Sequence, residues 1–280
     1  MDGFAIVSGL DPLVCRVRRM EPHLSRITIY PIKSLDGQEV DEAVLLRSGA
    51  LAHDREYCLI DPEGRVYNGK RSGDSLLPVR SEVDLARGFV TLSVNGTAAA
   101  FHLERDREGL ERWFTERLGG RAGIARDEEG GFPDDTEAHG PTVISTATLR
   151  EVASWFANID LEEARRRFRA NLEIDGVPAF WEDRLFGDEA GTVRFRIGDV
   201  TLEGVNPCAR CTVPSRDSRS GLIHQPEFAQ IFSKRRAKSL PEWAWRRRFD
   251  HYYRLSVNTR VEESQAGNIL ARGDTVTVQG

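Results

Sequence analysis

The sequence predicts an α+β protein rich in β-structure, with barrels or curled sheets covered by a few helices. Short apolar runs separated by turn signals recur along the chain, which is typical of strands. Only a few stretches show the 3.6-residue apolar period of a helix. The elements also lack the regular strand and helix alternation of a doubly wound α/β fold, so that class is not expected.

The N-terminal half is predicted to be mostly strands. After an irregular lead-in over residues 1–21, with a first strand around 13–17, the expected strands are 27–30, 40–46, 56–60 and 76–83. Residues 89–94 and 98–103 flank Asn95 and Gly96, a dipeptide that suits a tight hairpin turn. A helix over 106–118 ends at Gly119.

The C-terminal half begins after a soft boundary near residue 122, which divides the chain into domains 22–122 and 123–280. Residues 127–140 are predicted to be a polar loop. The expected strands are 142–145, 172–174, 193–197, 200–205, 253–261 and 275–278. The expected helices are 146–156, 160–168 and 228–236. Asp160 should cap the second helix, and residues 165–167, three arginines at its C-terminal end, should form a solvated face that complements the helix dipole.

Composition narrows the class of protein. The chain of 280 residues is 40% hydrophobic, which is enough for a core, and its net charge is −5. A general binder of nucleic acid or of anionic membranes would normally carry a basic surplus. Residues 1–20 lack the unbroken apolar stretch of a signal peptide, and no run approaches a membrane span. We therefore expect a cytoplasmic protein whose four cysteines are free thiols or ligands.

The strongest chemical signal is the pair Cys208 and Cys211, held in a stretch that also contains Arg210, Arg216 and Arg219. Nearby guanidinium groups favour the thiolate, which is the form that binds metals and attacks substrates. A zinc site would need a second ligand pair, and a thioredoxin-like motif would need the pair to open a helix. The third interpretation is one thiolate that ligates a cofactor metal or carries sulfur, with the second thiol in a supporting role.

A set of polar residues elsewhere suits an anionic ligand. Lys33 and Ser34 follow a predicted strand and supply an ammonium group and a hydroxyl group at its end. A lone lysine is also compatible with a plain surface position. The remaining candidates are Arg55, Ser145, Thr146, Arg169 and Asn171. Ser145 and Thr146 stand at a helix start, where they can cap the helix or hold an anion. Together these residues are expected to form an anion-holding shell beside the thiolate.

Two motifs resemble a known family. The segment 206–221, with Cys-x-Arg-Cys followed by Val-Pro and Arg-Asp, resembles the signature of MOSC-domain proteins. That family includes the mitochondrial amidoxime reducing component and its bacterial relatives. The segment 30–34, Tyr-Pro-Ile-Lys-Ser, resembles the start of the β-barrel domain that precedes MOSC in these proteins. The resemblance implies an N-terminal β-barrel-like domain packed on a MOSC β-barrel domain with peripheral helices.

The resemblance also implies a molybdenum cofactor, a molybdopterin held through its phosphate, with Cys211 as the molybdenum ligand and catalytic residue and Cys208 as its neighbour. Pyridoxal phosphate is not expected. The positions that match the cofactor-binding ones of the family are Lys33, Ser34, Arg55, His139, Gly140, Arg169, Ala209, Arg210 and Asn258.

The expected activity is reduction of N-hydroxylated compounds with electrons from a separate donor protein, flavoprotein or ferredoxin-like. Two alternatives stay open. In the first, the chain is a non-redox protein that binds the cofactor or carries sulfur as a persulfide on Cys211; in the second, it is a thiol-disulfide protein. Trp243 and Trp245, which precede three arginines, could form a lid or a docking face for the donor, although such a stretch is more often a packed amphipathic segment.

Overall fold

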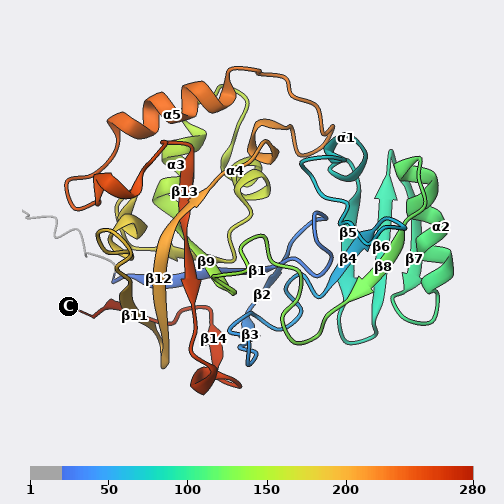
Figure 1. Cartoon of the computed structure of the whole chain (residues 1–280), viewed down its shortest axis with the longest axis horizontal. Coiled ribbons are helices and arrows are strands. Elements are labelled where there is room, and N and C mark those ends of the chain that lie inside the picture. Colours follow the sequence, from blue (N-terminus) through green and yellow to red (C-terminus); the bar gives the residue numbers. More distant parts are fainter. Residues whose placement is uncertain (1–20, 280) are drawn as a thin grey trace, which may run out of the picture.

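The computed structural model describes residues 21–279, and the strand expected around residues 13–17 lies outside that range. Its architecture is α+β with a large curved sheet, as predicted, and a smaller unit at one end (Figure 1). In spatial order the strands of the large sheet are β15 (Val276–Val278), β11 (Val193–Ile197), β12 (Val200–Ala209), β13 (Arg254–Arg260), β9 (Gly140–Ser145), β10 (Leu172–Asp175), β1 (His23–Ile29) and β2 (Gln38–Val40).

The large sheet is antiparallel except where β9 and β10 run parallel. That parallel pair is joined by two helices, α3 (Thr146–Ala153) and α4 (Leu161–Phe168), which is the crossover that a parallel connection requires. The sheet curls so far that its two ends meet. The contact between them is a hydrogen bond from the Leu24 backbone N–H to Asp274 O at 2.8 Å. Within the described range the named strands nevertheless do not close into a barrel, since β15 and β2 remain its edges.

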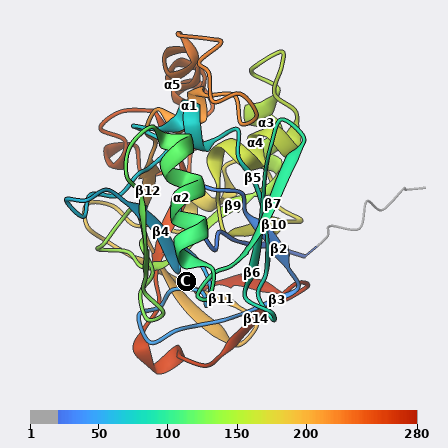
Figure 2. The same ribbon diagram turned by 90° about the vertical axis from the view of Figure 1, so that its right-hand side faces the viewer.

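The smaller unit contains the hairpin sheet β5 (Arg80–Asp84), β6 (Phe89–Val94) and β7 (Thr97–His102), and the pair β4 (Tyr57–Ile60) and β8 (Gly123–Arg126). Helix α2 (Arg107–Leu118) packs against these strands (Figure 2). A short pair, β3 (Glu42–Val44) with β14 (Ile269–Ala271), joins the N-terminal and C-terminal parts of the chain.

Local signals in the sequence correctly located several elements. The hairpin turn sits at Asn95 and Gly96, whose φ angles of 50° and 82° are the left-handed values that this turn requires. Helix α2 ends at Gly119 with φ of 67°. Asp160 caps α4 by accepting a hydrogen bond from the Glu163 N–H at 2.7 Å.

Other elements differ from the prediction. Residues 76–83 are not one strand, because a short helix, α1 (Gly73–Leu76), precedes β5 and Pro78 cannot donate to a ladder. Residues 40–46 are divided between β2 and β3, which join different sheets. Helix α3 ends at Ala153, before the expected residue 156. Strand β12 continues to Ala209, so Cys208 lies within a strand rather than after it.

The arginines at the end of α4 are not the solvated face that their pattern predicts. Arg167 is only 9% exposed and pairs with Glu163 at 2.5 Å, while Arg165 pairs with Glu173 of β10 at 2.5 Å. Tertiary contact with the sheet therefore buries charges that the helix alone would leave in water. The helical pattern alone could not indicate this, because Glu173 belongs to β10 and the packing of α4 on the sheet brings it to Arg165.

Strands β1 and β2 fall on the N-terminal side of the boundary expected at residue 122, yet they hydrogen-bond into the sheet built from later strands. The division into 22–122 and 123–280 stays a prediction about the sequence. Helix α5 (Phe228–Lys238) covers the large sheet at the top of the molecule (Figure 1). Across residues 21–279, no helix combines the length and the apolar character needed to cross a membrane.

A buried charged cluster links α3, α5 and the turn η1 (Trp181–Arg184). Arg236 of α5 pairs with Asp183 at 2.5 Å, and both are almost fully buried. Next to them, Glu182 accepts a hydrogen bond from Thr148 Oγ1 at 3.0 Å, while its second oxygen has no partner within the described chain. Burial, and then the neighbouring Asp183, raise the pKa of Glu182 to about 7.

Glu182→Gln should therefore change how stability depends on pH. The folded pKa lies above the unfolded value, so the contribution of Glu182 is fully present below about pH 4.5 and is lost as pH rises through 7. We expect urea unfolding of the parent protein to show a loss of up to ~3 kcal/mol between pH 5 and pH 8 from this group. The glutamine variant should lack that loss. The exposed Glu116→Gln in α2 is the matched control, and an unchanged pH dependence in Glu182→Gln would contradict the assignment.

Candidate functional site

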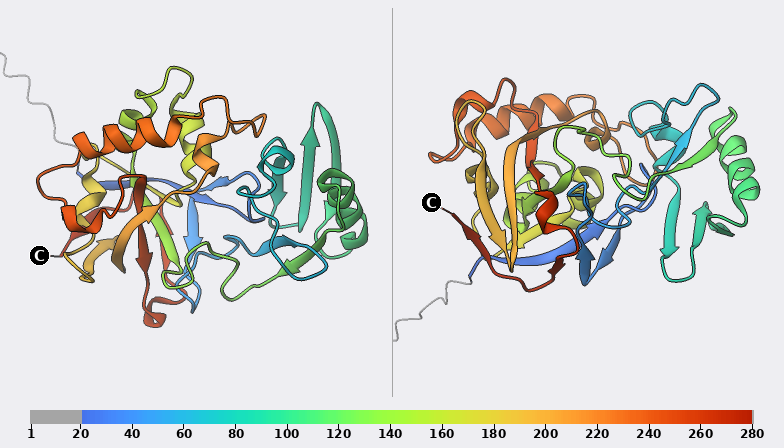
Figure 3. Two further views of the ribbon diagram at one scale, coloured as in Figure 1. Left: turned by 45° about the horizontal axis from the view of Figure 1, so that its top comes forward. Right: turned by 60° about the horizontal axis from the view of Figure 1, so that its bottom comes forward.

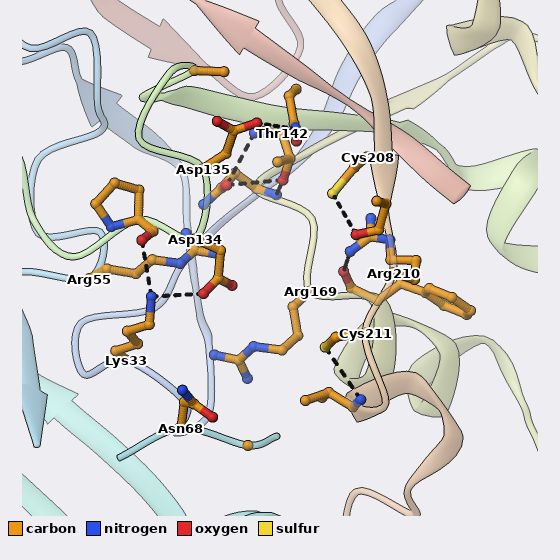
Figure 4. Close-up of a pocket in the computed structure, with 18 of the residues that line it drawn as sticks. Lys33, Arg55, Asn68, Asp134, Asp135, Thr142, Arg169, Cys208, Arg210 and Cys211 are labelled. Atoms are coloured by element: carbon orange, nitrogen blue, oxygen red, sulfur yellow. Dashed lines mark hydrogen bonds and ion pairs between the residues drawn. The ribbon is translucent and has the colours of Figure 1, made fainter. Parts of the chain in front are cut away.

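A cavity of about 630 Å³ opens where the end of β12 faces loops from both parts of the molecule (Figure 4). Its walls come from strands β9, β12 and β13, from the polar loop over residues 130–140, and from three turns around residues 33–34, 54–55 and 68–70. The volume is in the range of small-molecule and cofactor sites. The cavity is therefore the candidate functional site.

Most of the residues selected from the sequence line this one cavity. They are Lys33, Ser34, Arg55, His139, Gly140, Arg169, Asn171, Cys208, Ala209, Arg210, Cys211 and Asn258. The two exceptions are Ser145 and Thr146, which are buried at the start of α3 and are not part of the lining. Ser145 Oγ accepts from the Thr148 N–H at 3.1 Å, so it performs the capping role that the sequence also allowed.

The cavity is strongly cationic although the chain is acidic overall. Its lining includes eight lysine or arginine side chains against three carboxylates, in a protein with a net charge of −5. The cations are Lys33, Arg55, Lys70, Arg167, Arg169, Arg210, Arg248 and Arg254. A concave surface with an excess of one sign concentrates its field there, and this field favours an anionic ligand.

Several of these cations already have partners in the protein. Lys33 donates to the carbonyl oxygens of Phe132 and Pro133 at 2.8 and 3.1 Å and pairs with Asp134 at 2.7 Å. These three contacts use all three donors of an ammonium group. Lys33 thus holds the polar loop against the cavity, and its charge rather than a free donor is what it offers to a ligand.

Arg210 is similarly occupied. Its guanidinium donates to Phe168 O at 2.9 Å and to Leu255 O at 2.6 Å, and it also contacts Ser256 Oγ. Through these bonds it ties the end of β12 to the C-terminal end of α4 and to the start of β13. The side chain therefore positions the cavity wall while leaving its positive charge beside it.

Arg169 is different, because within residues 21–279 its guanidinium forms neither an ion pair nor a side-chain hydrogen bond. It stacks on the Tyr30 ring at 4.1 Å, with Arg55 on the same ring at 5.1 Å. Burial lowers the pKa of Arg169, the Tyr30 hydroxyl opposes this, and Arg55 lowers it further. A cation held beside another cation with no carboxylate of its own would be stabilised by a bound anion.

The backbone at the cavity is held in an unusual conformation. Ser34, Arg55 and Arg169 have φ angles of 72°, 54° and 51°, in the left-handed region that side chains other than glycine rarely adopt. Each such residue costs on the order of 1 kcal/mol, and residues of this kind concentrate at binding sites. All three are among the residues selected from the sequence, and the conformation orients their side chains at the cavity wall.

The two cysteines make opposite contacts. Cys211 Sγ accepts a hydrogen bond from the Val213 backbone N–H at 3.4 Å, whereas the Cys208 thiol donates to Ala209 O at 3.7 Å. The Cys211 sulfur is thus the acceptor of a hydrogen bond, whereas Cys208 is the donor of one. The pair is not joined in a disulfide. Figure 4 shows both sulfurs on the β12 side of the cavity, with Arg210 between them.

Three predicted residues have structural contacts that account for them. A Cβ on Gly140 would lie 2.4 Å from Thr259 Oγ1, so glycine permits β9 to approach β13. Asn171 accepts from Thr142 at 3.1 Å and donates to Thr28 O at 3.1 Å, which brackets β10 between β9 and β1. Asn258 donates to Asp135 at 2.9 Å and secures the polar loop.

Other lining residues were missed from the sequence. Asn68 and Lys70 reach the cavity from a turn of the smaller unit, and Asp134 and Asp135 reach it from the polar loop. The turn signal Asn-Gly-Lys at 68–70 was visible, but nothing in the pattern placed it near the thiols. Arg248 and Arg254 also line the cavity. Arg248 belongs to the segment after the tryptophans and Arg254 begins the strand β13, and neither pattern indicates a position at the cavity.

Comparison with known proteins identifies the family. The model of the MOSC N-terminal beta barrel domain matches residues 21–159, and the model of the MOSC domain matches residues 140–277. A molybdenum cofactor sulfurase of Drosophila mojavensis is 26% identical, covering 94% of this chain and 36% of the relative. One of Arabidopsis thaliana is 24% identical, covering 77% of this chain and 32% of the relative. The chain therefore spans well under half of either relative.

Among solved structures, the YUAD protein from Bacillus subtilis aligns over 92% of this chain and 94% of its own, with 13% identity and a TM-score of 0.41. The two family models together extend from residue 21 to residue 277, which includes both motifs and every residue of the cavity. The chain belongs to the MOSC-domain family, with the N-terminal beta barrel domain preceding the MOSC domain.

Proposed function

We propose that the cavity binds the molybdenum cofactor, with Cys211 on the metal, and that the protein reduces N-hydroxylated compounds. The observation that carries the proposal is a sulfur that accepts a backbone hydrogen bond in a cavity with an excess of cations. The relatives named molybdenum cofactor sulfurase support a connection with this cofactor, since they match over 94% and 77% of the chain.

The donor set fits the proposed group. Molybdenum accepts a soft thiolate ligand, which Cys211 can supply. The phosphate of a pterin needs a cation that is not already neutralised, and Arg169 meets this requirement within the described residues. Lys33, Arg55 and Arg210 add positive charge around it without competing for the same contacts.

The overall reaction needs two electrons and two protons per substrate. The N–O bond of R–NHOH breaks, the nitrogen leaves as R–NH₂, and the oxygen leaves as water. When bound, the cofactor supplies the two-electron redox chemistry. The electrons come from a separate donor protein, flavoprotein or ferredoxin-like.

The residues of the chain bind the cofactor and fix the positions of the groups around it. Cys211 presents its sulfur from the end of β12, and Arg210 fixes that end by bonding to two other elements. Lys33 holds the loop 132–134 beside the cavity by donating to two of its carbonyl oxygens. Arg169 keeps an anionic group in one orientation against the Tyr30 ring.

A second function is favoured by the relatives and by the same sulfur. In this alternative Cys211 attacks the outer sulfur of a persulfide donor, a new S–S bond forms on Cys211, and the donor leaves as a thiolate. The persulfide then passes its sulfur to an acceptor. The accessible, acceptor-type sulfur of Cys211 suits this role as well as it suits metal ligation.

Substituting the two cysteines separates these functions from thiol-disulfide chemistry. We expect Cys211→Ser to abolish reduction of a benzamidoxime-type substrate with an artificial electron donor, because the metal loses its thiolate. Cys208→Ser should leave a good part of the activity, since its thiol contacts only a carbonyl. Both variants are purified from a host that makes the cofactor, and their molybdenum and pterin contents are measured alongside the activity.

The outcomes divide clearly. Equal damage from both substitutions would favour a disulfide exchanger and contradict the unequal roles. Parent protein that contains no pterin but carries sulfane sulfur, lost only in Cys211→Ser, would replace the reductase with the sulfur carrier.

Two arginines of the cavity provide a matched test of the anion site. Arg169→Met should lower retained pterin about tenfold while the melting temperature changes little, because no carboxylate loses its partner and methionine still packs on Tyr30. Arg210→Met should instead destabilise the fold by ~1–3 kcal/mol, because it leaves the Phe168 and Leu255 carbonyls without their donor. Pterin is measured by acid oxidation and fluorescence, and stability by thermal unfolding. Full cofactor loading in Arg169→Met would remove Arg169 from the site.

A further inference from the structure

A cationic surface with two exposed tryptophans lies at one end of the molecule, outside the cavity. It comprises the C-terminal half of α5 and the segment that follows it as far as the turn η3 (Arg246–Arg248). Its exposed residues, which we call the docking surface, are Lys234, Arg235, Lys238, Trp243, Trp245, Arg246 and Arg247. Figures 1 and 3 place α5 and this segment at the end of the molecule opposite α2.

The charge of this surface is not balanced. None of its five cations forms an ion pair with any residue of the described range 21–279, and Glu242 is the one acidic residue in the whole segment 234–248. Some exposed arginines elsewhere have partners, as Arg194 does with Glu203 at 2.9 Å and Glu262 at 2.7 Å, while others, such as Arg71 and Arg150, have none within the described range. The docking surface differs from these scattered positions because its five unpaired cations lie together in the segment 234–247. The dipole of α5 accounts for cations in its last turn but not for Arg246 and Arg247, which lie beyond it.

The tryptophans are held on the surface. Trp243 and Trp245 are 42% and 47% exposed, which is unusual for a side chain that is highly buried on average. The Trp243 indole N–H donates to Phe180 O at 3.4 Å, and the Arg184 guanidinium lies over its ring at 4.9 Å. A fixed aromatic group surrounded by arginine is the composition that dominates the binding energy of protein interfaces.

The surface is anchored rigidly and adjoins the cavity. Arg236 of α5 is buried against Asp183, which fixes the helix. Arg248, the last residue of η3, donates to Gly187 O at 3.0 Å and to Val205 O at 2.7 Å, and it also lines the cavity. The docking surface and the wall that carries Cys211 are therefore joined through β12.

We propose that the docking surface binds a small acidic electron-carrier protein of the ferredoxin class, which supplies the electrons for reduction in the cavity. This rests on the proposed reductase function, because the reaction consumes two electrons that the substrate does not bring. Five unpaired cations select a partner with an acidic face, the tryptophans provide its desolvated centre, and continuity with the cavity places the partner near its target. A ferredoxin carries one electron, so two docking events serve each turnover.

The experiment measures binding of an acidic plant-type ferredoxin by isothermal titration calorimetry at low salt, using the cofactor-loaded protein. The test variant combines Lys234→Glu, Arg235→Glu and Arg247→Glu. The control combines Arg87→Glu, Arg105→Glu and Arg112→Glu, which makes the same change in net charge on exposed residues of the smaller unit. Thermal unfolding of both variants checks the fold, and Trp245→Ala tests the centre of the surface with no change in charge.

We expect the test variant to weaken ferredoxin binding at least tenfold, with an effect that diminishes as salt rises, and the control to weaken it less than threefold. Trp245→Ala should also weaken it about tenfold or more. Equal weakening by both triple variants, or no binding by the parent protein, would overturn the proposal. Binding to vesicles of phosphatidylserine and phosphatidylcholine is measured with the same proteins. If the test variant lost vesicle binding but still bound ferredoxin, the docking surface would be a lipid-binding surface and the proposal would be overturned.

The same proteins separate this proposal from the reductase function. Reduced methyl viologen is a small donor that needs no docking surface, so the test variant should keep its viologen-driven activity while losing ferredoxin-driven activity. An absence of viologen-driven activity in the parent protein would contradict the reductase function, whereas the calorimetry would still report on the surface. Loss of both activities in a test variant that retains its fold and cofactor would contradict the docking role.

Discussion

The Arg210 guanidinium is the contact on which the candidate site depends. It bonds to carbonyl oxygens at the end of α4 and at the start of β13, while its own backbone belongs to the segment that carries both cysteines. Phe168 O is one of its acceptors, so the next residue, Arg169, is fixed by the same contact. A single planar donor group thus sets the position of the sulfur and of the unpaired cation relative to one another.

This arrangement explains how a cationic cavity can exist in an acidic protein. Lys33, Arg210 and Arg254 use their donors on backbone or carboxylate acceptors, which offsets the repulsion of like charges. Within residues 21–279, Arg169 is the one partly buried cation of the wall whose guanidinium forms neither a hydrogen bond nor an ion pair, and it lies on the Tyr30 ring. In the proposed function, this unpaired charge is what would orient one anionic group within the cationic cavity.

The two proposed functions share the same sulfur and differ in what reaches it. A metal ligand and a persulfide carrier would both need an accessible sulfur in a cationic cavity, and Cys211 is a partly exposed sulfur in such a cavity. Both also require a protein partner, either for electrons or for sulfur. In our proposal the cationic docking surface, which is tied to the cavity through Arg248, binds such a partner.

The sequence by itself determined the elements that local chemistry controls. The hairpin at Asn95 and Gly96, the Asp160 cap and the Gly119 helix end follow from the backbone preferences of single residues, and the two motifs indicated many of the residues that line the cavity. Only the tertiary structure decided which charged and polar side chains are buried and which groups they contact. Whether Arg167 is solvated and whether Lys33 has a free donor depend on partners far away in the chain, such as Pro214 and Phe132. Ser145 caps its own helix through the nearby Thr148 N–H, but only the fold shows that it lies outside the cavity lining. Local periodicity carries no information about those distances, because folding over long separations, and not the pattern along the chain, brings these groups within hydrogen-bonding reach.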